Sequence, residues 1–355
     1  MTKISCRQIC FIMLVYTAVS KFVIYPTYLS YYTGRDLLFS ALLNFAVQGV
    51  IVWSVSYLCS RTDKTFFVLL KDTFGTVVAR IFYGLFALFF ILSAIVPLFE
   101  QKVYVHDIFY DMLPSLLVFL PVFFFLVYAS SKPFENIGRC ADICLPLFLI
   151  SMLLILVMSL PEVKFDNFLP VLTQPKKVFS SSFANIFRFL EPAYLLMFVG
   201  HFKYKKGDAA KITLSYVGGA VFVLIVLAAF YGIYGGVAPT RQLAISKISL
   251  FFPAIDLVGR IDLFALYVLE IAMLFALVLN IQLAVHCISE CTGYKNRTVL
   301  SLAVNASLLI ILIFCNNKFN AINVLFSEWM WIVYLLFANI FPLACWFLRK
   351  KNAKN

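Results

Sequence analysis

Two short segments combine charged side chains with a proline inside long apolar stretches of the sequence. The first spans residues 20–26 (SKFVIYP) and the second spans residues 188–192 (RFLEP). An ionisable side chain within a membrane span costs roughly 2.5–3.5 kcal/mol, so such residues are candidates for a functional site. Proline removes a backbone donor and clashes with the preceding turn, so each helix is expected to kink or unwind there. The candidate ligand-binding residues are Ser20, Lys21, Tyr25, Arg188 and Glu191.

The two segments lie in matching positions of the two halves of the chain. Lys21 and Arg188 are separated by nearly half of the 355 residues. Interrupted spans in corresponding positions of two inverted halves indicate a midplane binding site in a transporter fold. Unwound backbone offers free N–H and C=O groups, and half-helix ends favour the charged groups of a zwitterionic ligand. The alternative is local ion pairing, because Arg188 and Glu191 share a helix face and Lys21 could extend to an interface.

Other polar residues of the apolar stretches give weaker signals. Glu270 lies within a span and is a candidate for coupling or gating. Pro26 and Pro192 are further gating candidates, because a broken helix can move at its break. Glu100 and Glu328 are expected at the outer edge, in contact with headgroups or water.

The composition requires lipid as the main solvent. Apolar residues make up 63% of the chain and charged residues 13%, against roughly 45–50% and 25% in soluble domains. The net charge of +12 is typical of cytoplasmic loops of membrane proteins, so we predict no nucleic-acid partner. The sequence contains no phosphate loop, HExxH motif or Gly-x-Ser-x-Gly elbow. We therefore predict no enzymatic activity, no catalytic residues, no metal site and no cofactor.

The apolar stretches predict an all-α membrane protein with about ten transmembrane helices of ~17–25 residues. The predicted ranges are 9–29, 37–58, 77–99, 115–131, 141–160, 183–201, 212–235, 262–289, 298–315 and 325–348. They form one integral membrane domain over residues 1–355, with repeats of about 9–160 and 183–348. Gly218 and Gly219 are expected to allow close helix approach.

The distribution of charge predicts which side each loop faces. With the N-terminus inside, the cytoplasmic segments hold about twice as many Lys and Arg residues as the other side, which favours cytoplasmic N- and C-termini. Eight of the nine cysteines fall on the same side, a reducing compartment, so no disulfide is expected. A signal peptide cleaved near residues 18–20 is the alternative for the first stretch.

Several segments together resemble the GerAB-type spore germination proteins, the integral membrane subunit of nutrient germinant receptors. The resemblance runs from about residue 4 to residue 345. It rests on 4–8 (ISCRQ), 137–143 (IGRCADI) with Pro146, 159–161 (SLP), 167–172 (NFLPVL), 189–191 (FLE), 195–198 (LLMF) and 259–264 (GRIDLF). The family is related to the amino acid–polyamine–organocation permeases. The resemblance therefore implies a LeuT-like five-plus-five inverted repeat with broken helices 1 and 6.

The resemblance also implies a function and roles for the candidate residues. It implies a small nutrient (amino acid-like, sugar or ion) bound between helices 1 and 6, with other receptor subunits as partners in the spore inner membrane. Glu191 is then the partner of a ligand or cation. Lys21 is a carboxylate partner or an internal counter-ion to Glu191, and Arg188 is the second counter-ion. Because Lys21 stands where the family has a Gly-x-Gly-like break, a different ligand, a lysine-substituted ion site or a non-sensing subunit stays open.

Two rival functions remain at this point. A secondary transporter for amino acids or polyamines would accumulate solute against a gradient. A ligand-free structural subunit would be affected by cavity substitutions only through its stability.

Overall fold

The computed structural model describes residues 4–59, 62, 64–110, 112–250 and 262–344, and these are almost entirely helical. The first helix begins at a capping box, in which Ser5 and Gln8 bond each other's backbone N–H groups. The α-helices are α1 Cys6–Val19, α2 Tyr25–Thr33, α3 Leu37–Cys59, α4 Phe66–Phe74, α5 Thr76–Phe109, α6 Ser115–Ser130, α7 Phe134–Ser159, α8 Pro175–Ala184, α9 Glu191–Met197, α10 Asp208–Tyr234, α11 Ala244–Ser249, α12 Asp262–Thr292, α13 Arg297–Phe314, α14 Phe319–Glu328 and α15 Trp331–Tyr334.

Each of the ten predicted ranges overlaps a helix or a broken helical pair, and residues 345–348 of the last range lie outside the described residues. Within the described residues, six helical segments are long and apolar enough to cross a membrane by themselves, and the bent pair formed by α14 and Trp331–Ala344 makes a seventh. That pair bends by 58°, and its second half contains a π-helical turn over Leu335–Ile340. The other predicted spans are shorter because they are interrupted (α1 and α9) or begin after a proline (α6). The predicted all-α membrane fold is confirmed.

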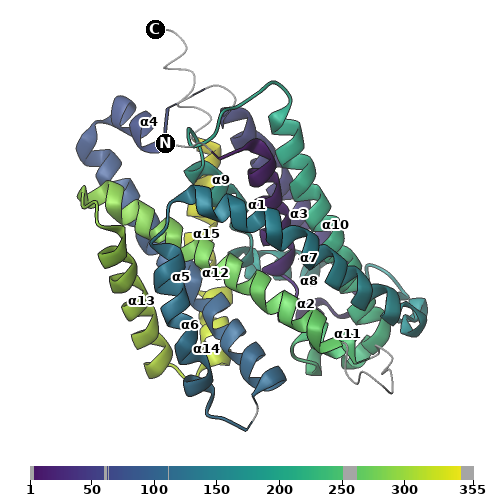
Figure 1. Ribbon diagram of the computed structural model, residues 1–355. Coiled ribbons are helices and arrows are strands. Elements are labelled where there is room, and N and C mark those ends of the chain that lie inside the picture. Colours follow the sequence, from purple (N-terminus) through teal and green to yellow (C-terminus); the bar gives the residue numbers. More distant parts are fainter. Residues whose placement is uncertain (1–3, 60–61, 63, 111, 251–261, 345–355) are drawn as a thin grey trace.

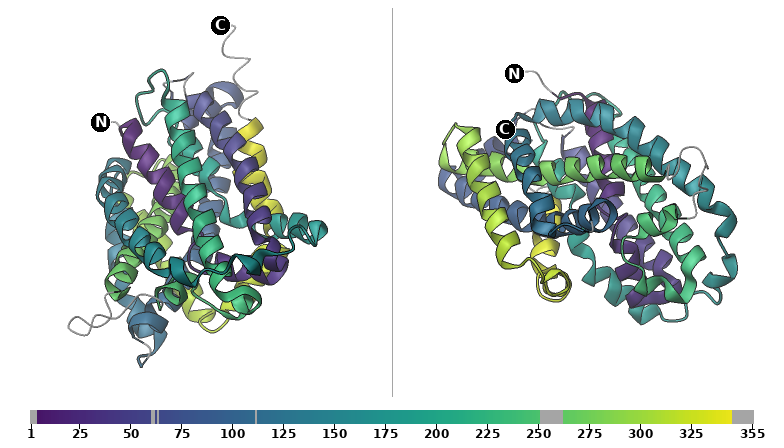
Figure 2. Two further views of the ribbon diagram at one scale, coloured as in Figure 1. Left: turned by 90° about the vertical axis from the view of Figure 1, so that its right-hand side faces the viewer. Right: turned by 60° about the horizontal axis from the view of Figure 1, so that its bottom comes forward.

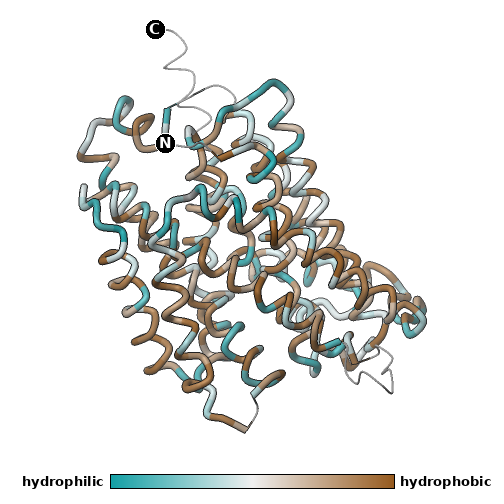
Figure 3. The backbone as a smooth tube through the Cα atoms, viewed as in Figure 1, coloured by the Kyte–Doolittle hydropathy of each residue, from teal (hydrophilic) through white to brown (hydrophobic). Residues whose placement is uncertain are grey.

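The long helices pack into one bundle whose exterior is apolar. α5 packs along α12, and α1 packs between α10 and α7; Figures 1 and 2 show α13 at the rim of this bundle. Figure 3 shows hydrophobic residues along the middle of the helices and hydrophilic residues gathered in the connections at their ends. Isoleucine, leucine, valine and phenylalanine side chains are exposed on these outer faces, as expected where the solvent is lipid.

Short helices occupy three regions that the sequence predicted as loops. α4 and α8 are nine and ten residues long, and α11 has six residues. None is long enough to span a bilayer, which is why a search for long apolar stretches does not find them.

The first three residues of the segment 259–264 (GRIDLF), on which part of the resemblance rests, lie outside the described residues.

The close approach predicted for Gly218 and Gly219 occurs where α10 meets α1. A methyl group at Gly219 would lie 2.9 Å from Thr17 Cβ and 3.0 Å from the Leu14 carbonyl oxygen. We expect Gly219→Ala to lower the free energy of unfolding by about 1–3 kcal/mol through overpacking, measured as a loss of thermal stability in detergent. Gly218→Ala is the matched control, because its methyl group would lie 3.8 Å from Leu14 Cδ1, an ordinary contact. Equal losses in both variants would contradict this account.

Candidate functional site

The first transmembrane helix is broken, as its proline predicts. α1 ends at Val19 and α2 begins at Tyr25, with Pro26 in its first turn. Proline fits a first turn because its missing N–H needs no partner there. Lys21 therefore lies in the unwound segment between the two half-helices. The Val23 carbonyl in that segment accepts a hydrogen bond from the Ala244 N–H at 2.8 Å, which ties the break to α11.

The sixth transmembrane helix is broken in the same way. A short 3₁₀ turn ends at Arg188, and α9 begins at Glu191 with Pro192 in its first turn. Phe189 between them has φ −112° and ψ 85°, which no helix adopts. Arg188 and Glu191 therefore do not share a helix face, although they are three residues apart in the sequence.

Lys21 and Glu191 form a buried ion pair that joins the two breaks. The distance from Lys21 Nζ to Glu191 Oε1 is 2.6 Å, and both side chains are fully buried. Lys21 Nζ also donates to Ser20 Oγ at 3.1 Å and lies 4.5 Å from the centre of the Phe189 ring. Of the two roles predicted for Lys21, its contacts are those of an internal counter-ion to Glu191.

Arg188 has a partner that the sequence did not assign to it. Its Nη1 lies 2.6 Å from Glu100 Oε1, and its Nη2 donates to Asn323 Oδ1 at 3.3 Å. The prediction that Glu100 lies at the outer edge was wrong, because this side chain is buried. The predicted span ended at residue 99, whereas α5 continues to Phe109 and keeps Glu100 inside the bundle. Arg188 is therefore a counter-ion, as predicted, but its partner is Glu100 rather than Glu191. Glu328 is exposed, as predicted.

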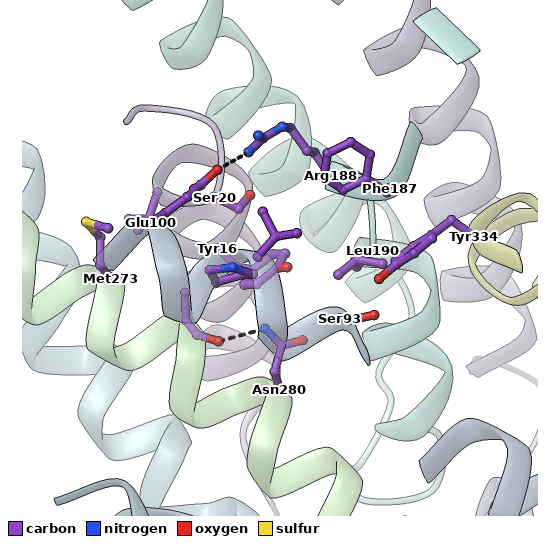
Figure 4. Close-up of a pocket in the computed structure, with 14 residues that line it drawn as sticks. Tyr16, Ser20, Ser93, Glu100, Phe187, Arg188, Leu190, Met273, Asn280 and Tyr334 are labelled. Atoms are coloured by element: carbon purple, nitrogen blue, oxygen red, sulfur yellow. Dashed lines mark hydrogen bonds and ion pairs between the residues drawn. The ribbon is translucent and has the colours of Figure 1, made fainter. Parts of the chain in front are cut away.

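A small cavity lies beside these pairs. Its volume is about 40 Å³ when only the space open to the centres of water molecules is counted. Of the predicted residues, Ser20 and Arg188 line the cavity, as Figure 4 shows. Lys21, Tyr25 and Glu191 are not among its lining residues. The remaining walls are formed by Tyr16, Val19, Ser93, Val96, Pro97, Glu100, Phe187, Leu190, Met273, Ala276, Asn280 and Tyr334.

One side of the cavity carries a hydrogen-bonded network that sequence reasoning missed. The Tyr194 hydroxyl on α9 bonds the Tyr16 hydroxyl on α1 at 2.7 Å and also bonds Asn280 Oδ1 on α12. All three side chains are buried. A tyrosine in an apolar helix gives no spacing signal of its own, and the three residues lie on three different helices.

Glu270 lies outside the cavity, in the contact between α12 and α5. Its Oε1 accepts a hydrogen bond from Gln101 Nε2 at 2.8 Å. Met273, one turn further along α12, lines the cavity. Glu270 therefore lies close to a cavity-lining residue but does not itself line the cavity.

Comparison with known proteins gives the family and the fold. A family model described as spore germination protein matches residues 3–320. The chain belongs to the spore germination protein family. Its fold is similar to the solved structure of MhsT in complex with L-phenylalanine, with a TM-score of 0.68 over 96% of this chain and 90% of that chain. The two sequences are 12% identical, so the likeness concerns the fold alone. No curated protein matches the sequence.

These findings confirm the predicted resemblance and the LeuT-like fold. This spore germination protein is a multi-pass membrane protein in contact with the lipid bilayer. The two helix breaks, predicted from a cation followed by a proline, occur in helices 1 and 6 of that fold.

Proposed function

We propose that this spore germination protein is the membrane subunit of a nutrient germinant receptor. It binds a small solute (amino acid-like, sugar or ion) in the midplane between helices 1 and 6, and this binding triggers germination. Other receptor subunits contact this subunit within the membrane or through loops, and they respond to the change in its conformation. The chain acts in the spore inner membrane with its N- and C-termini in the cytoplasm.

The observation that carries the proposal is a set of buried polar atoms at the two breaks that have no partner within the described residues. These atoms are Glu191 Oε2, Arg188 Nε and the Tyr25 hydroxyl oxygen. Leaving such groups unpaired away from water costs about 1–3 kcal/mol each. A solute that carries both hydrogen-bond donors and acceptors would satisfy them, and the cavity lined by Ser20 and Arg188 lies beside them.

The lining of the cavity supports a binding step coupled to movement. Of the candidate residues, Lys21, Tyr25 and Glu191 do not line the cavity in the described conformation. Contact between a solute and these residues then requires the half-helices to separate, and binding would bias the relative packing of two helix bundles. A ligand shifts such an equilibrium only by its difference in affinity for the two states.

A secondary transporter for amino acids or polyamines is the second candidate function. The likeness to MhsT, solved in complex with L-phenylalanine, favours it. It differs from a receptor in one measurable respect, because reconstituted protein would accumulate solute against a gradient. A ligand-free structural subunit is the remaining alternative.

The proposal is tested by a thermal-stability screen of the purified protein against amino acids, polyamines, sugars and simple ions. A solute at 100 times its Kd should add about 2.7 kcal/mol to the free energy of unfolding. We expect Glu191→Gln to remove that gain and to abolish the germination response while the protein still inserts. Glu328→Gln is the control, because this glutamate is exposed. Unchanged germinant sensitivity in Glu191→Gln would refute the assignment, and no stabilisation by any solute would favour the structural subunit.

A further inference from the structure

A second buried carboxylate site lies between α5 and α12, away from the helix breaks. Glu270 of α12 is 9% exposed and Gln101 of α5 is fully buried. Gln101 Nε2 donates to Glu270 Oε1 at 2.8 Å. The two helices pack along each other, so this contact lies in the interior of the bundle.

Each of these two side chains keeps one oxygen without a hydrogen-bond partner in the described residues. The atoms are Glu270 Oε2 and Gln101 Oε1. An ionised carboxylate with a single neutral partner is strongly disfavoured in an apolar interior.

Two cations that could neutralise Glu270 already have partners: Lys102, next to Gln101 in the sequence, and Arg188, at the cavity. Lys102 Nζ bonds the Asn316 side chain and carbonyl at 2.5 and 2.8 Å, and Arg188 is paired with Glu100. The Tyr104 hydroxyl, also on α5, donates to the Leu266 carbonyl at 3.0 Å.

The helices packed on α5 and α12 carry few charged residues. α4 and α14 pack on α5, with Lys71 and Asp72 on α4 and Glu328 at the end of α14. α6 contains no charged residue, and α13 carries only Arg297, at its first position. The charged residues of α7 all fall within its first nine positions (Glu135, Arg139 and Asp142), and α1 carries only Arg7, in its first turn.

One proton would satisfy both unpaired oxygens at once. A carboxylic acid and an amide form a ring of two hydrogen bonds, in which the amide N–H donates to the acid carbonyl and the acid O–H donates to the amide oxygen. The first of these bonds is present. The second needs a hydrogen between the two atoms that lack partners.

We propose that Glu270 and Gln101 form a proton-binding site, in which Glu270 Oε2 takes up a proton from the aqueous phase and donates it in a hydrogen bond to Gln101 Oε1. Uptake forms one O–H bond and removes the negative charge of the carboxylate, with no electron transferred. The site does not depend on the proposed nutrient function, because neither side chain lines the cavity.

A metal ion fits the same place less well than a proton. Hard cations take about six or more oxygen ligands, and the site offers the two unpaired oxygens of Glu270 and Gln101. Within the described part of the chain, no group of three or more His, Cys, Asp or Glu residues is placed to hold a metal.

Proton exchange at this site is positioned to affect the cavity. Gln101 directly follows Glu100, which pairs with Arg188, and Met273, one turn from Glu270, lines the cavity. Loss of the proton would place a new negative charge beside these residues. The site is therefore suited to couple proton binding to the packing of α5 against α12.

The proposal is tested by infrared spectroscopy of the full-length protein in liposomes at neutral pH. A protonated carboxyl group has its own carbonyl stretching band, which shifts on exchange into D₂O. We expect the difference between wild type and Glu270→Gln to show the loss of one such band, whereas Glu328→Gln, at an exposed site, removes none. Glu270→Gln is expected to fold, because two amides form the same pair of hydrogen bonds.

A second variant keeps the test decisive if that one does not fold. Gln101→Leu is expected to retain the band and shift it to higher frequency, since the acid loses its amide partner. A wild-type spectrum with no band assignable to Glu270, or a band unaffected by both variants, would overturn the proposal. A Glu270 carboxylate band that changes on adding Na⁺ or K⁺ would overturn it in favour of a cation site.

Discussion

Lys21→Met is expected to lower the free energy of unfolding by about 3–5 kcal/mol, because it leaves Glu191 buried without its counter-ion. Lys21 Nζ and Glu191 Oε1 lie 2.6 Å apart, and neither side chain is exposed. The loss should appear in equilibrium unfolding in detergent micelles. Replacing both residues, in Lys21→Met with Glu191→Leu, should recover most of this stability, since an apolar pair of similar volume often replaces a buried ion pair without loss.

The matched control is an ion pair of the same length on the surface. Lys64 Nζ lies 2.7 Å from Asp72 Oδ2, with the two side chains 61% and 38% exposed. We expect Lys64→Met to cost about 0–1 kcal/mol, as exposed pairs do. The ion pair would not hold the two breaks together if Lys21→Met cost no more stability than Lys64→Met. The same conclusion would follow if the double variant were as unstable as Lys21→Met.

The helix breaks could be predicted from the sequence because they depend on local chemistry. A proline cannot sit inside a helix without losing a hydrogen bond, and a charged residue nearby requires a partner away from lipid. Both rules act within a few residues, so Lys21 with Pro26, and Arg188 with Pro192, identified the two breaks. The places of the long helices in the sequence were predicted for the same reason, because each is a continuous apolar stretch.

The partners of the charged residues could not be predicted in the same way. The i, i+3 rule for Arg188 and Glu191 assumes a continuous helix, and the break that the proline creates removes that condition. Glu100 was missed because α5 extends ten residues beyond the predicted limit of its span. Tyr16, Tyr194 and Asn280 meet only through the packing of three helices, which no local pattern encodes.

Arg188 is the residue at which stability and ligand binding should separate most clearly. Arg188→Met is expected to lower the free energy of unfolding by about 3–5 kcal/mol, because Glu100 is then buried without its partner at 2.6 Å. Arg188→Lys keeps a positive charge for Glu100. It lacks the Nε atom and the second terminal nitrogen, Nη2, which donates a hydrogen bond to Asn323. We therefore expect Arg188→Lys to keep most of the stability while losing the stabilisation that a nutrient confers on the wild type.

The comparison uses unfolding in micelles with and without the solute found in the screen. Arg7→Met is the control, because its pair with Asp142 at 3.2 Å lies at the surface, with the two side chains 69% and 24% accessible. It should change neither quantity by more than about 1 kcal/mol. A receptor or transporter site predicts that Arg188→Lys is stable but unresponsive. Full ligand-induced stabilisation in Arg188→Lys would show that Arg188 serves only to neutralise Glu100, and the ligand would then have to bind through the remaining polar atoms of the breaks, Glu191 Oε2 and the Tyr25 hydroxyl.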